Sequence, residues 1–120
     1  MVQTLQNFIN GEFVTPAGTE LLDIINPTNG EVVAQSPVSV ESDVDDAMAA
    51  AAAAFKTWKH ATPSQRQLLL LKLADAMEAN SEELVEAQHR NTGQVKEMIA
   101  GEEVAVGADQ IRFFAGAARL

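Results

Sequence analysis

The sequence predicts a mixed α/β fold in which short strand hairpins (residues 1–38) precede a helical region of about four helices (residues 39–120). In the first part, Asn-Gly and Asn-Pro steps separate short runs of strand formers. Near Ser39 the spacing of apolar residues changes from about two to about three and a half, which is typical of helices. A chain of 120 residues has the length of one domain.

Four short segments of the first part carry strand formers: residues 7–9, 12–14, 21–25 and 31–35. Asn10-Gly11 separates the first two segments and accepts the positive φ angles of a type I′ turn, which predicts a hairpin. Residues 26–30 contain proline and glycine and predict a turn between the other two segments. Strands so short and so few do not make a self-sufficient sheet.

The first two helices are predicted from their caps and apolar stripes. Ser39 or Ser42 is expected to cap the first helix, and Trp58 is expected to end its stripe as a core residue. Thr62 and Gln65 form a capping box that opens the second helix. The stripe of the first helix is Val44, Met48, Ala51, Phe55 and Trp58. The expected buried face of the second is Leu69, Leu73, Ala76 and Met77.

Two further helices complete the predicted pattern. Asn80 and Glu83 suggest a capping box at the start of the third helix, and Gly93 is expected to end it. The fourth helix runs from about Lys96 to Leu120, because no stop signal interrupts it. Its apolar stripe is Val104, Ala108, Ile111, Ala115 and Ala118.

The net charge of −9 is unevenly distributed. Residues 1–55 hold eight acidic and no basic side chains, whereas nine acids and eight bases follow. Contacts to phosphates need lysine and arginine, so we expect no nucleic-acid partner. The longest apolar run, residues 47–55, is too short to span a membrane, and the N-terminus lacks the basic region of a signal peptide. We therefore expect a soluble, cytoplasmic protein without membrane segments.

Residues that carry chemistry are few. The chain has no cysteine, which excludes a disulfide scaffold, a thiolate metal site and a cysteine nucleophile within these residues. His60 and His89 lie far apart in the sequence and are expected at helix ends or on the surface. No glycine-rich loop between a strand and a helix indicates a phosphate cradle. We therefore assign no catalytic and no cofactor-binding residue.

The fourth helix also has a line of mixed polar and apolar residues: Ile99, Glu103, Val106, Gln110, Phe113 and Ala117. Two interpretations stay open. The line is either an edge face partly in water, or a half-buried face that lines a channel. In a channel, a carboxylate such as that of Glu102 or Glu103 would attract a cationic ligand. Of the rings of Phe113 and Phe114, one is expected in the core and the other beside the channel.

Several of these segments, in this order and spacing, resemble the N-terminal region of NAD(P)-dependent aldehyde dehydrogenases. The matching motifs are Phe8-Ile9-Asn10-Gly11-Glu12-Phe13-Val14, Ile25-Asn26-Pro27-Thr28-Asn29-Gly30-Glu31-Val32, residues 47–58, Pro63-Ser64-Gln65-Arg66, Leu73-Ala74-Asp75, Asn91-Thr92-Gly93 and Phe113-Phe114-Ala115-Gly116. The resemblance covers essentially the whole chain. Residues 112–119 look most like the aminoaldehyde (gamma-aminobutyraldehyde) dehydrogenases, which act on substrates such as 4-aminobutanal.

The resemblance implies that the chain is the N-terminal part of a Rossmann-like coenzyme-binding domain whose catalytic and oligomerisation parts lie elsewhere. In the family, a cysteine thiolate attacks the aldehyde, hydride passes to NAD(P)⁺, and a glutamate-activated water releases the acid. None of these residues falls in the matched region, so we expect the chain alone to be inactive and to bind neither NAD nor NADP. The implied partners are the remainder of the enzyme, an aldehyde substrate and further copies in a dimer or tetramer.

Two minor site roles follow from the resemblance. The family often binds a structural monovalent cation, Na⁺ or K⁺, through a backbone carbonyl that corresponds to Ile25 and an acidic residue that corresponds to Asn91. Here an amide replaces that carboxylate, but its oxygen can still coordinate a hard cation. The fourth helix of the family lines the aldehyde entrance, which places Glu102, Glu103 and Val106 at the substrate channel.

Two hypotheses of function remain from the sequence. In the first, the chain is the N-terminal segment of an NAD(P)-dependent aldehyde dehydrogenase that oxidises an aldehyde to the carboxylic acid. In the second, it is a truncated, non-enzymatic interaction or assembly module whose unpaired strands and apolar stripes need a partner. A small metal-binding domain is a third idea, to which two separated histidines give little support.

Overall fold

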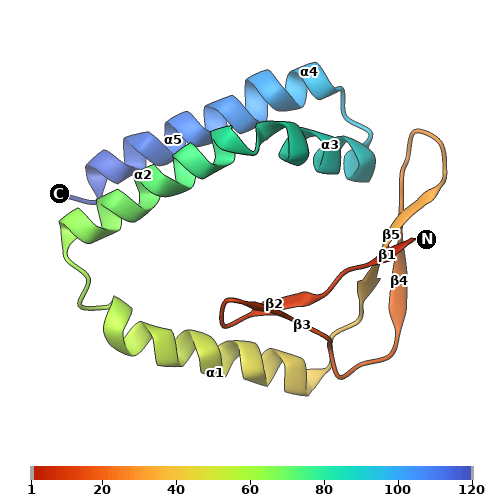
Figure 1. The fold of residues 1–120 in the computed structure, drawn as a ribbon, viewed down its shortest axis with the longest axis horizontal. Coiled ribbons are helices and arrows are strands. Elements are labelled where there is room, and N and C mark those ends of the chain that lie inside the picture. Colours follow the sequence, from red (N-terminus) through yellow and green to blue (C-terminus); the bar gives the residue numbers. More distant parts are fainter. Residues whose placement is uncertain (1, 120) are drawn as a thin grey trace. The chain divides into compact units, whose positions relative to one another are not determined.

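The computed structural model describes residues 2–119 and contains the predicted order of strands followed by helices (Figure 1). The strands are β1 (Gln3–Thr4), β2 (Asn7–Ile9), β3 (Glu12–Val14), β4 (Leu21–Ile25) and β5 (Val32–Pro37). The helical segments are α1 (Glu41–Trp58), α2 (Pro63–Ala79), α3 (Ser81–Thr92), α4 (Lys96–Met98), the π-helix η1 (Ile99–Val104) and α5 (Ala105–Ala117). The predicted mixed α/β class is therefore confirmed. No helix in the described part of the chain is long and apolar enough to cross a membrane.

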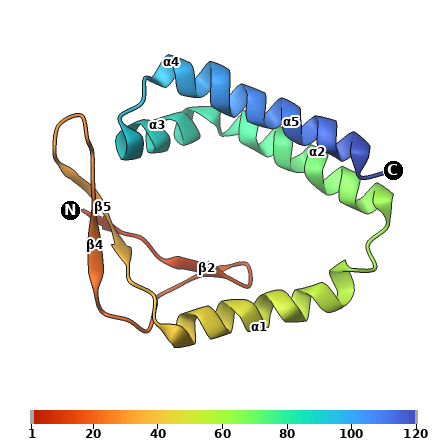
Figure 2. The ribbon, with the colours of Figure 1, turned by 180° about the vertical axis from the view of Figure 1, so that it is seen from behind.

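The chain forms two compact units, Met1–His60 and Ala61–Leu120. The first unit holds the strands and α1, and the second holds the remaining helices, as both ribbon views show (Figures 1 and 2). The buried apolar residues of the described chain all lie in the second unit: Ala74, Ile99, Val104, Ala108 and Ala115. The buried side chains of the first unit are polar, those of Asn26 and Asp43. Hydrogen bonds rather than a packed apolar core therefore organise the first unit.

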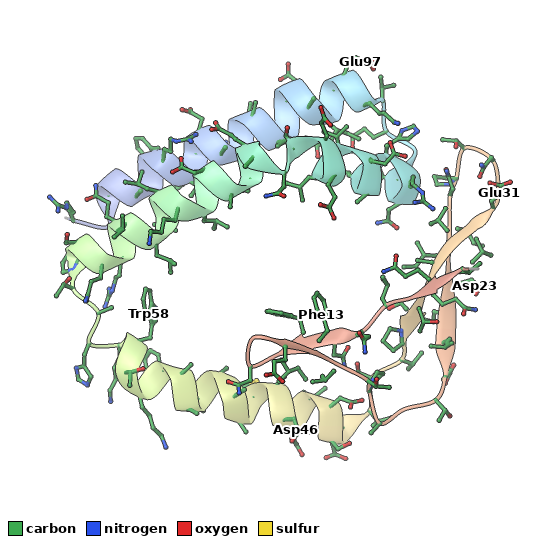
Figure 3. All side chains as sticks on the ribbon, viewed as in Figure 1. Phe13, Asp23, Glu31, Asp46, Trp58 and Glu97 are labelled. Carbon is green, nitrogen blue, oxygen red and sulfur yellow. The ribbon has the colours of Figure 1, made fainter. Side chains whose placement is uncertain are left out.

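A hairpin joins β2 and β3, as predicted. Asn10 and Gly11 have φ angles of 55° and 85°, so the turn uses the left-handed conformations that these two residue types tolerate best. The antiparallel register pairs Phe8 with Phe13, whose rings meet edge to face with centroids 5.1 Å apart. Both rings are mostly exposed, and Figure 3 shows Phe13 pointing away from α1. The hairpin thus presents an aromatic pair that the first unit leaves uncovered.

The second sheet has the strand order β1–β5–β4. β4 and β5 pair antiparallel, which confirms the second predicted strand pair. Their connection is shaped by the buried Asn26, whose Oδ1 accepts hydrogen bonds from the N–H (2.9 Å) and the hydroxyl (2.7 Å) of Thr28. β1 pairs in parallel with β5. The sequence does not predict β1, because two residues are too few to show a periodicity.

Helix α1 begins at a different cap from the two that the sequence predicts. Val40 is the N-cap residue, and no side-chain cap bond comes from Ser39 or Ser42. Instead, the buried carboxylate of Asp43 accepts hydrogen bonds from the N–H groups of Val40 and Ala17, both at 2.8 Å. The bond from Ala17, followed by that from Val40, lowers the pKa of Asp43 below its ordinary value of 3.8. Asp43 thereby fastens the connection before β4 to the start of α1.

The apolar stripe predicted for α1 is present, but the first unit does not bury it. Val44, Met48 and Phe55 are each more than half exposed. The prediction that Trp58, labelled in Figure 3 at the end of α1, lies in the core is wrong. This residue is 44% exposed. The tip of the β2–β3 hairpin instead lies against the alanine run of α1, beside a cavity of about 360 Å³. Alanine side chains allow this close approach but leave little apolar area to bury.

Helices α2 and α5 lie side by side and form the core of the second unit (Figures 1 and 2). The predicted capping box opens α2: Thr62 Oγ1 accepts from the Gln65 N–H (3.2 Å), and Gln65 Oε1 accepts from the Thr62 N–H (2.8 Å). Small residues meet where the helices touch, since Ala74, Ala108 and Ala115 have no exposed surface. This packing brings the two backbones close together.

The buried face predicted for α2 is wrong in part. Leu69 and Leu73 are about half exposed, and Ala74 is the buried residue of this helix. The edge of the contact with α5 is charged: Arg112 donates to Asp75 (2.8 Å) and to Glu78 (2.7 Å). The hydrogen bond from Arg112 lowers the pKa of Glu78 below its ordinary value of 4.5. The helix pair therefore combines an alanine contact with ion pairs at its rim.

The third helix begins and ends where the sequence predicts. Asn80 is at the N-cap of α3, but its side-chain amide donates to the carbonyl of Ala76 (2.8 Å) and makes no capping box. Gly93 ends the helix with a φ of 74°, a left-handed conformation that suits glycine. The fourth helix begins at α4 as expected, and α5 ends at Ala117, earlier than expected. The expected end at Leu120 lies outside the described residues.

The π-helical turn η1 is not predicted, and it changes which residues of the fourth helix are buried. In a π-helix an N–H bonds to a carbonyl five residues earlier, as the Ala105 N–H does with Ala100. Ile99 is fully buried, like the α5 alanines, and Val104 nearly so. The predicted stripe that begins at Val104 is therefore confirmed at its buried positions. Ile99 joins that buried face, whereas Glu103 is exposed. The predicted line of mixed polar and apolar residues from Ile99 to Ala117 therefore does not form one continuous face with the same degree of burial.

Candidate functional site

A pocket of about 630 Å³ lies between α2, α3 and η1 in the second unit. One face of α3 supplies most of its wall, because its lining residues recur three to four positions apart. These residues are Leu84, Ala87, Gln88, Asn91 and Thr92. Met77 of α2 and Val104 of η1 add apolar surface, and Glu103 of η1 adds a carboxylate. The pocket thus has both apolar and polar lining residues.

Glu103 is the acidic group of this pocket, and two amides hold it. Its carboxylate accepts hydrogen bonds from the side chains of Gln88 and Gln94, and Gln88 also donates to Gln94 Oε1 (3.1 Å). The bond from Gln88, followed by that from Gln94, lowers the pKa of Glu103 below its ordinary value of 4.5. Glu103 therefore carries a negative charge at neutral pH.

The turn after α3 brings Gln94 to this position. Gly93 takes the left-handed conformation that ends the helix. The backbone carbonyl oxygen of Gln94 then lies 2.7 Å from His89 Nδ1. The backbone N–H of Gln94 donates to Thr92 Oγ1 (3.3 Å). His89 thus has the helix-terminal role expected from the sequence. These contacts fix the backbone from which the Gln94 amide reaches Glu103.

The sequence singles out neither Gln88 nor Gln94 as a site residue. Their partner Glu103 lies on a different helix, and no local pattern indicates that contact. The sequence does offer one indication that Gln88 belongs to the site. Gln88 lies three residues before Asn91, and this helical spacing places both residues on one face.

The structure brings together only two of the predicted site residues. Asn91 and Glu103 line the same pocket, whereas Glu102 and Val106 are exposed and do not line it. Ile25, at the end of β4, belongs to the first unit, so its pairing with Asn91 at a cation stays a prediction. Within residues 2–119, no group of three or more histidine, aspartate or glutamate side chains is arranged to hold a metal ion.

The aromatic pair of the fourth helix differs from its prediction. The rings of Phe113 and Phe114 meet edge to face with centroids 5.4 Å apart. They are 72% and 60% exposed, so the expectation that one ring lies in the core of this chain is wrong. The buried positions of α5 are taken by Ala108 and Ala115, which pack against α2. Both rings stand outside that contact.

The arrangement of the pocket suits binding rather than bond making. A single carboxylate held by two amides recognises a cation or a hydrogen-bond donor, and the chain has no thiol to act as a nucleophile. β5 passes into α1 through Val38, Ser39 and Val40, without the glycine-rich turn that cradles dinucleotide phosphates.

A sequence profile of the aldehyde dehydrogenase family matches residues 13–120. The chain belongs to this family. Malonate-semialdehyde dehydrogenase 1 of Geobacillus kaustophilus is 36% identical over 116 residues, which are 97% of this chain and 24% of that enzyme. The long-chain-aldehyde dehydrogenase of an Acinetobacter species is 38% identical over 115 residues, which are 95% of this chain and 23% of that enzyme. The chain thus spans about a quarter of the length of these aldehyde dehydrogenases.

Solved structures of aldehyde dehydrogenases share the fold. The Bartonella henselae enzyme superimposes with a TM-score of 0.93 at 28% identity, covering 99% of this chain and 25% of that one. PnpE in complex with nicotinamide adenine dinucleotide superimposes with a TM-score of 0.91 at 36% identity, covering 96% of this chain and 24% of that one. The resemblance to aldehyde dehydrogenases is therefore confirmed. The aminoaldehyde subgroup finds no support in these comparisons.

Proposed function

We propose that the chain is the N-terminal segment of an NAD(P)-dependent aldehyde dehydrogenase that oxidises an aldehyde to the carboxylic acid. One observation carries the proposal: the family profile matches residues 13–120, while the relatives are about four times as long. The strands and helices described above then form the first part of a coenzyme-binding domain. The chemistry belongs to the remaining three quarters of the enzyme.

The chain alone is expected to be inactive. It has no cysteine, so it lacks the thiolate that the family uses as its nucleophile. When NAD(P)⁺ is bound in the complete enzyme, it accepts the hydride. Titrating the 120-residue chain with NAD⁺ and with NADP⁺ in a calorimeter should give no binding heat. Saturable binding of either coenzyme would contradict the assignment of the coenzyme pocket to later residues.

Uncovered apolar surface supports the remainder of the enzyme as the first partner of this chain. Phe8, Phe13 and Phe55 are each more than half exposed, although aromatic rings contribute most when buried. Burying such surface stabilises by roughly 25 cal/mol per Å², so later parts of the polypeptide have a reason to pack here. A cytoplasmic dimer or tetramer completes the proposal, on the strength of the family resemblance.

For the substrate we propose an amino-aldehyde such as 4-aminobutanal. The charged Glu103 at the pocket rim supports it, as does the similarity of residues 112–119 to aminoaldehyde dehydrogenases. In the complete enzyme, Glu103→Gln should raise the KM for a cationic aldehyde much more than for a neutral aldehyde of the same length. Glu97→Gln is the matched control, because Glu97 is exposed and does not line the pocket. Equal effects on both aldehydes would contradict the electrostatic account.

For the cation we propose Na⁺ or K⁺ held by the Ile25 carbonyl and the Asn91 side-chain oxygen. Hard monovalent cations prefer oxygen ligands, and Asn91 is exposed at the pocket where it can supply one. Raising the K⁺ concentration at constant ionic strength should stabilise the complete enzyme, and Asn91→Ala should abolish that effect. Stabilisation that survives Asn91→Ala would remove this residue from the site.

The same exposed apolar surface keeps a second function open, that of a non-enzymatic interaction or assembly module. In that case the uncovered stripe of α1 would bind a partner or a second copy. Sedimentation of the chain distinguishes the cases. A monomer that unfolds cooperatively would remove the reason to propose a partner for the isolated chain.

A further inference from the structure

The sequence contains the Asn-Gly step twice, at Asn10-Gly11 and at Asn29-Gly30. This step is chemically labile. Glycine has no side chain, so nothing hinders the attack of its backbone nitrogen on the side-chain carbonyl carbon of the preceding asparagine. Both steps are exposed in turns between strands, so access of water does not distinguish them. Their hydrogen bonds do.

Asn29-Gly30 is held at each reacting group. The Asn29 amide donates to Glu31 Oε2 (2.9 Å), and its Oδ1 accepts from the Glu31 N–H (3.0 Å). The attacking nitrogen, that of Gly30, donates to the carbonyl of Asn26 (2.8 Å). The turn also closes a pair of five-residue and six-residue strands. Reaction at Asn29 therefore requires several hydrogen bonds to break together.

Asn10-Gly11 has none of these restraints. Within residues 2–119, neither the Asn10 side chain nor the Gly11 N–H makes a hydrogen bond. The turn closes a two-stranded sheet of only three residue pairs, an arrangement that is marginally stable in water. Opening of this hairpin tip is therefore easier than opening of the other turn.

We propose that Asn10 is a site of spontaneous deamidation and that Asn29 is protected from it. The Gly11 nitrogen loses its proton to solvent base and bonds to the side-chain carbonyl carbon of Asn10. The bond from that carbon to the amide nitrogen breaks, and ammonia leaves. Water then opens the five-membered succinimide ring at either carbonyl, which yields aspartate or isoaspartate at position 10. No oxidant or reductant takes part.

The modification adds one negative charge at a sensitive place. Asn10 and Gly11 line the cavity between the hairpin tip and the alanine run of α1, where no basic side chain lies. Residues 1–55 contain no lysine or arginine to compensate a new carboxylate. Isoaspartate also lengthens the backbone inside a two-residue turn, whose geometry sets the register of β2 and β3. Deamidation should therefore weaken the hairpin.

The test incubates the complete folded polypeptide that carries these 120 residues in mildly alkaline buffer and follows both steps by peptide mapping with mass spectrometry. Asn10 should react about tenfold or more faster than Asn29, since the Asn29 step must lose several hydrogen bonds first. In denaturant the two steps should react at similar rates. Asn10→Gly keeps a turn-compatible pair and should abolish reaction at this position, whereas Glu31→Ala should accelerate reaction at Asn29.

The proposal is overturned if Asn29 reacts as fast as Asn10 in the folded chain. It is also overturned if both steps stay intact there while the denatured chain reacts. Isoelectric focusing supplies an independent readout, because deamidated chain carries one more negative charge.

Discussion

Replacing Ile99 with alanine should destabilise the second unit by about 3 kcal/mol. Ile99 is the largest fully buried side chain of the described residues, with no exposed surface. The change removes three carbon atoms from that position, each worth about 0.8 kcal/mol when buried. A residual cavity at the start of η1 adds to this loss, which places the total within the roughly 2–5 kcal/mol seen for such substitutions.

The assay is urea unfolding of the 120-residue chain, followed by far-ultraviolet circular dichroism. Met98→Ala is the matched control, since Met98 is the preceding residue and is 54% exposed. This control should change the free energy of unfolding by less than about 0.5 kcal/mol. The fluorescence of Trp58, the one tryptophan, reports on the first unit and shows whether the loss is confined to the second. A loss for Ile99→Ala no larger than for Met98→Ala would refute the burial assigned to the π-helical turn.

Three further predictions concern local features of the second unit. Thr62→Ala should lower the free energy of unfolding by about 1 kcal/mol through loss of the cap, and Thr62→Ser should restore most of it in the same urea assay. Gly101→Ala should raise the free energy of unfolding by roughly 0.5–1 kcal/mol, because the added Cβ meets no neighbouring atom. Gly93→Ala should lower it, because Gly93 has a φ of 74° that alanine adopts only with strain. Changes of the same sign for the two substitutions would be inconsistent with these backbone conformations. The lowered pKa of Glu103 contributes stability above its ordinary value of 4.5, and this contribution is lost as pH falls through the lowered value. The difference in unfolding free energy between the chain and Glu103→Gln should therefore shrink below pH 4.5, and a difference that grows there would contradict the hydrogen bonds from Gln88 and Gln94.

Structural features that depend only on neighbouring residues can be predicted from the sequence. Asn10-Gly11 forms its hairpin because those two residues tolerate positive φ angles at little cost. Thr62 and Gln65 satisfy one another's backbone N–H groups within a single turn, and Gly93 ends a helix for the same local reason. In each case the chemistry lies within a few residues, so no distant partner is needed to predict it.

Structural features that depend on contacts between distant residues cannot be predicted from the sequence in this way. The bond from Ala17 to Asp43 joins a loop to a helix, and serine was the better cap by local preference alone. The stripe that ends at Trp58 has the spacing of a core face, but spacing does not say whether a partner covers it. At the pocket, Glu103 is recognisable as a polar interruption, whereas Gln88 and Gln94 become site residues only through tertiary contact.

The most direct test of the central claim is to isolate, from cells that express it, the polypeptide that carries these 120 residues. Its intact mass and its aldehyde-dependent reduction of NAD⁺ or NADP⁺ are then measured on the same sample. The account predicts a mass roughly four times 12.8 kDa, together with activity that requires both an aldehyde and a coenzyme. A polypeptide of 12.8 kDa that has no bound partner, and no aldehyde oxidation, would contradict it.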